Sequence, residues 1–134
     1  MKLDHVGIAV QSIEDALGTY RQRLGFTVHE IVVIDEQKVR VAVLPAGASR
    51  IELLEPTAPD SPIQRFLEKR GEGVHHLCFQ VKDIQKKIEE LRLASLQLIS
   101  MSSATGLEGR KIAFLHPKST HGVLIELVEC DPDS

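Results

Sequence analysis

Two stretches of the chain, 71 residues apart, share the same alternation of apolar and polar positions. They are Asp4–Val10 and His75–Val81. Alternation with a period of two predicts a β-strand, and each stretch is followed by a polar break and then by apolar residues at helical spacing. The helical positions are Ile13, Leu17, Tyr20 and Leu24 in the first copy, and Ile84, Ile88 and Leu91 in the second. The chain therefore predicts a duplicated strand-helix unit.

The predicted helices have start and stop signals, and strand-like sequence follows each of them. Ser12 and Asp83 stand where N-caps belong, and Gly25 stands where the first helix should end. The expected strands are Thr27–Ile34, Val39–Leu44 and Arg50–Glu55, then Gln97–Ser100, Ile112–Leu115 and Val123–Glu129. The pattern predicts an α+β fold of two βαβββ modules, residues 3–55 and 74–129. We expect one domain over residues 1–134, because a half of about 60 residues is marginally stable alone.

Four polar residues occupy the strand face that points away from the helices: His5, Glu52, His76 and Glu126. If the modules come together as the repeat suggests, these side chains converge on one concave sheet face. Two imidazoles and two carboxylates suit a divalent metal ion of the first transition row. A single His or Glu in a strand usually just faces solvent, and a His–Glu pair can also be structural. The duplicated His then Glu pattern favours the metal site.

Composition narrows the class of protein without deciding its chemistry. The chain has 134 residues, of which 43% are hydrophobic and 26% charged, which excludes wholesale disorder. Its net charge of −3 and scattered lysines and arginines argue against nucleic-acid binding. No apolar run is long enough for a membrane span and no secretory signal is expected. Cys78 and Cys130 form no disulfide framework, so we expect a cytoplasmic location.

Several short passages resemble the vicinal oxygen chelate superfamily, also called the glyoxalase/bleomycin-resistance/dioxygenase superfamily. Within it, the chain is most similar to the methylmalonyl-CoA epimerases. The passages are Asp4–Val10, Ile51–Pro56, Asp60–Ile63, Gly73–His76, Phe114–Lys118 and Gly122–Leu127. The His and Glu positions are shared across the superfamily, whereas the last two passages are more specific to the epimerases. The resemblance covers nearly the whole chain.

The resemblance implies a cupped mixed sheet around a divalent metal ion (Co, Zn, Mn, Ni or Fe), usually in a homodimer. It implies an isomerase that interconverts the epimers of the acyl-CoA thioester methylmalonyl-CoA by removing the proton alpha to the thioester. By matching motif, His5, His76 and Glu126 are metal ligands. Glu52 stands at the fourth ligand position, where some epimerases carry Gln.

The acid/base residues are less well defined by the motifs. Glu126 is the first candidate base. Some family members place a second carboxylate where this chain has Val41, so Glu52 or a bound water is the candidate replacement. In the loop before the last strand, Lys118 and Ser119 could hold the substrate carboxylate or thioester. The alternative is that this loop is simply a turn fixed by Pro117.

Other functions are compatible with the same arrangement of His and Glu residues. A glyoxalase I-type lyase also uses two His and two Glu, and an extradiol dioxygenase uses two His and one carboxylate on ferrous iron. A drug-binding relative would keep the fold and lack the ligands, which the intact His5, His76 and Glu126 argue against.

Overall fold

The computed structural model describes residues 1–99, 104–105 and 109–130. The chain divides into two compact units, each of which is described by itself. One unit is His5–His75, and the other comprises Met1–Asp4 together with His76–Ser134. The boundaries fall inside two strands, so the N-terminal residues of the chain belong with its C-terminal half.

The His5–His75 unit follows the predicted order of strand, helix and three strands, with one further helix. Its strand order is β2-β3-β4-β1, with β1 parallel to β4 and the other pairs antiparallel. The helices and strands are β1 (Lys2–Ala9), α1 (Ile13–Leu17), a π-helix (Gly18–Arg23), β2 (Glu30–Ile34), a 3-10 turn (Asp35–Gln37), β3 (Val39–Ala46), β4 (Ser49–Pro56) and α2 (Pro62–Arg70).

The second unit repeats this arrangement with a smaller edge strand. Its strand order is β5-β8-β7-β6, with β5 parallel to β8 and the other pairs antiparallel. The elements are β5 (Gly73–Val81), α3 (Ile84–Leu93), β6 (Ala104–Thr105), β7 (Lys111–Leu115), a 3-10 turn (Pro117–Ser119) and β8 (Ile125–Glu129).

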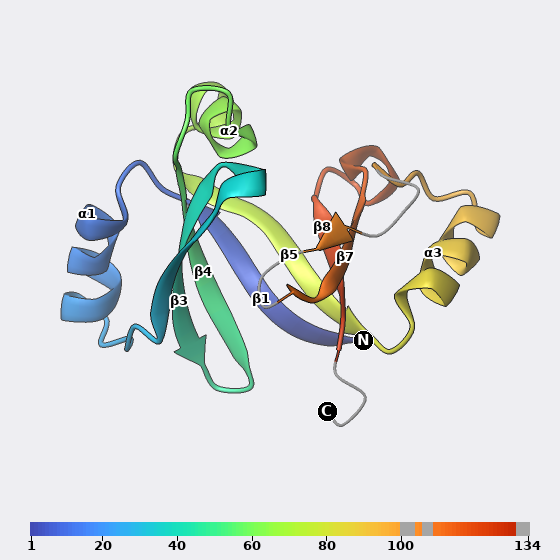
Figure 1. Cartoon of the computed structure of the whole chain (residues 1–134), viewed down its shortest axis with the longest axis horizontal. Coiled ribbons are helices and arrows are strands. Elements are labelled where there is room, and N and C mark those ends of the chain that lie inside the picture. The colour runs from blue at the N-terminus through green and yellow to red at the C-terminus, as the bar shows by residue number, and fades with distance from the viewer. Residues whose placement is uncertain (100–103, 106–108, 131–134) are drawn as a thin grey trace. The chain divides into compact units, whose positions relative to one another are not determined.

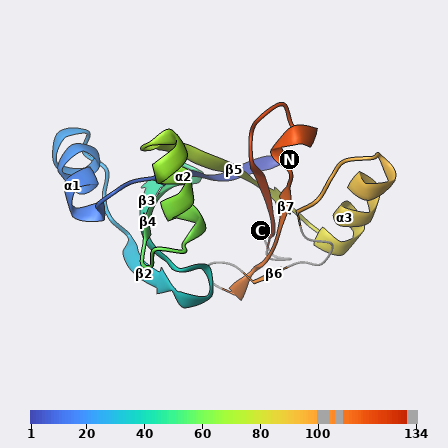
Figure 2. The same cartoon turned by 90° about the horizontal axis from the view of Figure 1, so that it is seen from above.

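Each unit buries one face of its strands under a helix. In the first, α1 lies beside β3 and β4 (Figure 1), and Ile13 and Leu17 pack with Ala42, Leu44 and Leu53. In the second, α3 lies beside β7 (Figure 2), and its buried side chains join a core from β5, β7 and β8. The members of this core are Val81, Ile84, Ile88, Leu98, Ala113, Leu115 and Leu127. The opposite faces of these strands are therefore not used for packing against these helices.

The two principal helices start in the same way, because the repeat extends to their caps. Ser12 and Asp83 accept hydrogen bonds from backbone N–H groups three residues on, as predicted. In each unit, a glutamate near the end of β4 or β8 provides a second acceptor. Glu55 Oε1 accepts from the Ile13 N–H at 3.0 Å, and Glu129 Oε2 accepts from the Ile84 N–H at 3.1 Å. These hydrogen bonds therefore link α1 to β4 and α3 to β8.

The predicted first helix is correct at its start and wrong at its end. After Leu17 the chain continues as a π-helix, in which the Leu24 N–H bonds to the Thr19 carbonyl at 2.9 Å. This wider turn rotates later residues off the apolar face. Leu24 is consequently 62% exposed rather than buried, while Gly25 adopts the predicted positive φ of 88°.

Three predicted strands are shorter in the structure or reduced to a bridge. The strand expected at Thr27–Ile34 begins only at Glu30. The strand expected at Gln97–Ser100 is an isolated bridge between Leu98 and Leu115, and Ser100 lies outside the described residues. The last strand starts at Ile125 rather than Val123. Within the described part of the chain, no helix is both long and apolar enough to cross a bilayer.

Candidate functional site

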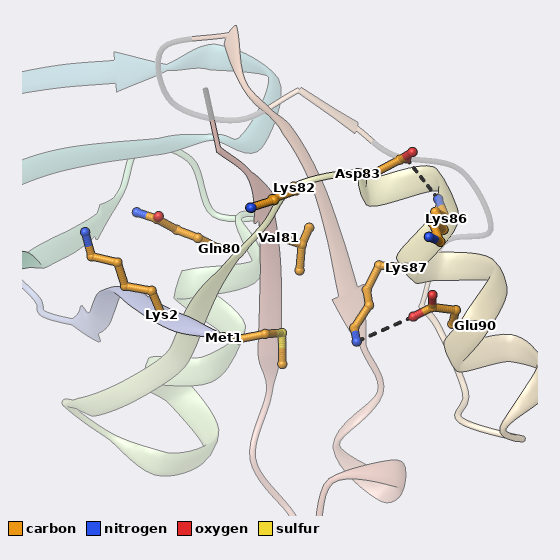
Figure 3. Close-up of a pocket in the computed structure, with 9 residues that line it drawn as sticks. All are labelled: Met1, Lys2, Gln80, Val81, Lys82, Asp83, Lys86, Lys87 and Glu90. Atoms are coloured by element: carbon orange, nitrogen blue, oxygen red, sulfur yellow. Dashed lines mark hydrogen bonds and ion pairs between the residues drawn. The ribbon is translucent and has the colours of Figure 1, made fainter. Parts of the chain in front are cut away.

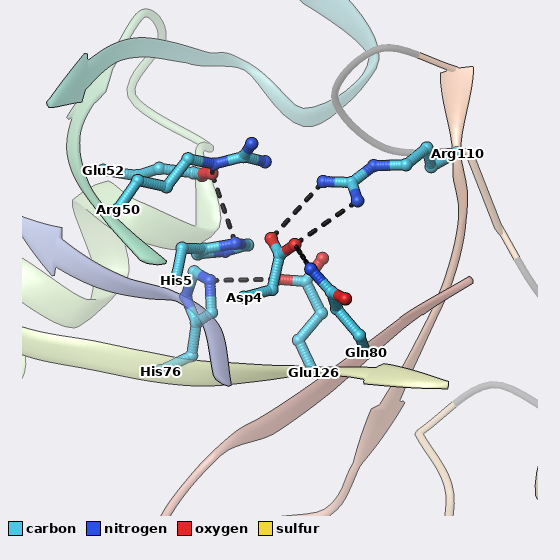
Figure 4. A network of polar contacts seen from close by, with 8 residues as sticks. All are labelled: Asp4, His5, Arg50, Glu52, His76, Gln80, Arg110 and Glu126. Atoms are coloured by element: carbon cyan, nitrogen blue, oxygen red, sulfur yellow. Dashed lines mark hydrogen bonds and ion pairs between the residues drawn. The ribbon is translucent and has the colours of Figure 1, made fainter. Parts of the chain in front are cut away.

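The first candidate pair, His5 and Glu52, lies on two parallel strands of the His5–His75 unit. Glu52 of β4 is in register with Gly7 of β1, so His5 stands two residues earlier on the same face. The imidazole Nδ1 lies 3.2 Å from Glu52 Oε2, and both side chains are buried. The Arg50 Nε donates to the same oxygen at 2.9 Å. Glu52 Oε2 therefore receives two nitrogen contacts (Figure 4).

The second candidate pair, His76 and Glu126, repeats that register in the other unit. Glu126 of β8 is in register with Cys78 of β5, so His76 again stands two residues earlier on the same face. His76 Nε2 lies 2.9 Å from Glu126 Oε1, and both side chains are buried. The Phe114 ring meets the His76 ring edge-on, with centroids 6.3 Å apart. The duplicated sequence thus gives a duplicated His–Glu contact.

The strand face that carries His76 and Glu126 also carries a small apolar cluster. Cys78, Ile112 and Val128 are buried there as a small cluster, with Phe114 against it. Cys78 fills space in this cluster. In the other unit, Val41 is 1% exposed and is paired across the sheet with Val32 and Leu54. The Val41 position, where some relatives carry a carboxylate, is therefore apolar in this chain.

A third buried carboxylate, Asp4, was missed by the sequence analysis. Its Oδ1 accepts a hydrogen bond from Gln80 Nε2 at 2.9 Å, and the Arg110 guanidinium contacts both of its oxygens at 3.3 Å (Figure 4). Asp4 precedes His5 directly, but nothing in the sequence indicates a partner 106 residues away. By contrast, Arg50 shares the strand face of Glu52, so its contact could have been expected from alternation.

The loop with Lys118 and Ser119 follows β7 and leads to β8. Phe114 is opposite Glu126, so this loop begins just beyond the level of the Glu126 side chain. The backbone is a 3-10 turn in which His116 Nδ1 accepts from the Lys118 N–H at 3.1 Å. The Ser119 hydroxyl accepts from the Gln97 N–H at 2.8 Å. The turn and the substrate-binding interpretation of this loop are compatible, since the ammonium group of Lys118 is not used in these contacts.

The donor types fit a divalent transition-metal ion. His5, His76 and Glu126 are buried and carry the nitrogen and oxygen ligand atoms that such ions bind. Glu52 adds a second buried carboxylate. Buried carboxylates need a compensating positive charge, which Arg50 supplies beside Glu52 and which a divalent ion would also supply.

Comparison with known proteins identifies the family. Residues 4–114 match the Glyoxalase/Bleomycin resistance protein/Dioxygenase superfamily, and the chain belongs to it. A relative from Bacillus subtilis, described as the uncharacterized protein YqjC, is 44% identical over 98% of this chain and 92% of its own. The ethylmalonyl-CoA/methylmalonyl-CoA epimerase of Cereibacter sphaeroides is 38% identical over 94% of this chain and 96% of its own.

A solved structure agrees with these relatives. A variant of the methylmalonyl-CoA epimerase of Streptomyces coelicolor, in complex with 2-nitronate-propionyl-CoA, is 38% identical with a TM-score of 0.92. The match covers 98% of this chain and 96% of that one. The predicted superfamily and the glyoxalase-like α+β fold class are confirmed.

Proposed function

We propose that the chain is a metal-dependent epimerase that interconverts the two epimers of methylmalonyl-CoA. The observation that carries this proposal is the duplicated His–Glu contact, buried in each unit at the same strand register. We propose that His5, His76, Glu126 and Glu52 together hold one divalent ion, which is Co, Zn, Mn, Ni or Fe. The names of the relatives support the reaction and the CoA thioester substrate.

The reacting carbon of methylmalonyl-CoA lies between a thioester carbonyl and a carboxylate. Loss of its proton moves negative charge onto the thioester oxygen, and a divalent ion held here would supply Lewis-acid stabilisation of that charge. The protein must then move a proton on each face of the carbon. We propose that Glu126 accepts and returns the proton on one face, and that Glu52 or a water molecule serves the other.

The surroundings of these groups suit such chemistry. The apolar cluster of Cys78, Ile112 and Val128 limits water on the strand face of His76 and Glu126. Glu52 is held by Arg50 and His5, which suits a ligand with a fixed orientation. Lys118 and Ser119, at the end of β7, are proposed to bind the substrate carboxylate or thioester. As in the family, we propose a homodimer.

The same reaction is chemically possible with acyl groups other than methylmalonyl. Ethylmalonyl-CoA has the same thioester and carboxylate around its α-carbon, and the Cereibacter sphaeroides relative is named for both substrates. We therefore propose malonyl-type CoA thioesters with a short alkyl substituent as the substrate class.

The test is exchange of the α-proton. The metal-loaded protein is incubated with a single epimer of methylmalonyl-CoA in deuterated water, and the α-carbon is followed by proton NMR. We expect deuterium incorporation together with formation of the other epimer, and loss of both in Glu126→Gln. His29→Ala is the matched control, because His29 is exposed. An α-carbon that keeps its proton with the wild-type protein would refute the proposal.

One observation favours a second candidate, a glyoxalase I-type lyase. That enzyme type uses two His and two Glu, and Glu52 supplies the second carboxylate in contact with His5. An assay with methylglyoxal and glutathione decides between the two. Turnover of this mixture without exchange at methylmalonyl-CoA would make the lyase the better assignment.

A further inference from the structure

We propose that a lysine-lined pocket in the unit of His76 and Glu126 binds the phosphate-bearing nucleotide end of the CoA thioester. This inference rests on the proposed function and extends it to a second part of the substrate. The pocket, called the lysine pocket below, has a volume of about 540 Å³ and lies where β5 runs into α3 (Figure 3). Its walls include Lys2, Lys82, Lys86, Lys87, Met1 and Gln80.

The charge of the lysine pocket suits a phosphate-rich ligand. Two carboxylates also line it, and both have other contacts. Asp83 Oδ1 accepts from the Lys86 backbone N–H at 3.1 Å as the cap of α3, and Glu90 lies 3.7 Å from the Lys87 ammonium. In the part of the chain that the structure describes, Lys2, Lys82 and Lys86 form no ion pair, whereas Lys87 does.

Four lysines and two carboxylates line the pocket, so its formal charge is positive although the net charge of the chain is −3. Like charges that are gathered on one wall repel one another, and a bound anion relieves that repulsion. Phosphate oxygens accept strong, charge-assisted hydrogen bonds from lysine. The nucleotide end of coenzyme A carries a pyrophosphate and a separate 3′-phosphate, so it offers several such acceptors. It is also large enough to occupy a pocket.

The lysine pocket also lies at a suitable place along β5. Gln80 forms part of its wall and shares the strand face of His76, four residues away. At about 3.3 Å a residue, this separation is roughly 13 Å. The pantetheine arm between the thioester sulfur and the pyrophosphate of CoA is comparable in length with four residues of extended chain.

The strand register gives the substrate a direction. The loop with Lys118 precedes Ile125, which is opposite Leu77 in the middle of β5. The pocket lies at the end of β5, around Val81, which is opposite Glu129. An acyl group at His76 and Glu126 would thus have Lys118 on one side and its CoA arm running along β5 toward the lysine pocket on the other.

The experiment compares two substrates that differ only in the nucleotide. Steady-state kinetics are measured with methylmalonyl-CoA and with methylmalonyl-pantetheine, which has no phosphates, for wild type and for Lys82→Gln/Lys86→Gln. We expect the double variant to raise KM for the CoA thioester ~10-fold with kcat unchanged, and to leave both constants for the pantetheine thioester as in wild type. Equal KM values for the CoA thioester in the two proteins would overturn the proposal.

Two further variants locate the effect. Lys111→Gln removes an exposed lysine elsewhere in the same unit and should change neither KM. Lys69→Gln/Arg70→Gln removes an exposed basic pair in the last turn of α2, a different surface to which phosphates could bind. A rise in KM confined to this α2 variant would contradict the lysine pocket. Unfolding temperatures equal to that of wild type establish that each variant is folded.

A binding measurement separates this inference from the proposed reaction. Adenosine 3′,5′-bisphosphate and inorganic phosphate are titrated separately into wild type and into the Lys82→Gln/Lys86→Gln variant by calorimetry. We expect the bisphosphate to bind wild type and to lose ~10-fold in affinity in the variant, even if neither thioester is epimerised. Unchanged affinity in the variant, or inorganic phosphate binding as tightly as the bisphosphate, would refute a nucleotide site.

Discussion

The imidazole Nε2 of His76 lies 2.9 Å from the carboxylate Oε1 of Glu126, and both side chains are buried on the same strand face. The partner atoms are a nitrogen and an oxygen that commonly bind transition-metal ions. The contact fixes the orientation of both groups, which would serve as metal ligands under the proposed function. In the other unit, His5 Nδ1 likewise lies 3.2 Å from Glu52 Oε2, and both side chains are buried.

The proposed metal site predicts that binding of the ion needs a histidine from each unit. We expect His76→Ala and His5→Ala each to weaken binding of Co²⁺ or Zn²⁺ by ~100-fold or more, because each removes a proposed ligand. Loss of a contact that merely supports a ligand typically costs 10–100-fold. Isothermal titration calorimetry and elemental analysis of the purified variants measure this. His29→Ala should retain wild-type affinity, since this imidazole is exposed. If His5→Ala bound metal as tightly as wild type, the two pairs would not share one ion.

The glutamate that tethers α3 should contribute to stability. We expect Glu129→Ala to lower the free energy of unfolding by about 1 kcal/mol, because it removes the acceptor for the Ile84 N–H. Glu129→Gln should recover part of this loss, since an amide oxygen also accepts. Urea titration followed by circular dichroism gives the values. Glu36→Ala, at an exposed position, is the control, and an equal loss there would show that the tether is unimportant.

Leu17 and Leu24 should respond very differently to truncation, although both belong to the predicted apolar stripe. Leu17 is 6% exposed and Leu24 is 62% exposed. We expect Leu17→Ala to lower the free energy of unfolding by about 2–5 kcal/mol and Leu24→Ala by less than about 0.5 kcal/mol. Thermal and urea unfolding compare the two. A large loss in Leu24→Ala would mean that the first helix continues as a regular α-helix.

An ion pair on the surface of the His5–His75 unit should make stability depend on pH. The Arg40 side chain, 2.7 Å from Glu14, donates a hydrogen bond that lowers the pKa of Glu14 below its ordinary value of 4.5. A lowered pKa in the folded state stabilises the protein above the unfolded value, and this stabilisation is lost as the pH falls through the folded value.

The variant Glu14→Gln isolates that contribution. We expect its unfolding temperature to lie slightly below that of wild type at pH 7 and to equal it at strongly acidic pH, because protonated Glu14 no longer pairs with Arg40. The exposed position keeps the effect small. A difference that stayed constant from pH 7 to acid would show that charge is not responsible. Differential scanning calorimetry over this pH range makes the comparison.

Much of the fold follows from local patterns. Alternation along the strands places His5 and His76 on one phase and the helix-facing residues on the other, and side chains next to each other in a strand must point to opposite faces. The caps at Ser12 and Asp83 are also local, since a cap needs only the backbone N–H groups of the next turn. The duplicated pattern predicts that these features occur twice, and they do.

The sequence by itself determined the repeated strands and helices, the four polar positions and the resemblance to the vicinal oxygen chelate superfamily, because each depends on short patterns of residues close together in the chain. Only the tertiary structure decided which side chains from distant parts of the chain come into contact. The Asp4–Arg110 ion pair, the Glu129 tether and the exposure of Leu24 depend on long-range packing or on a local π-turn that no spacing reveals. Contacts between distant residues are set by strand register and by the fit of packed layers, which no single segment encodes.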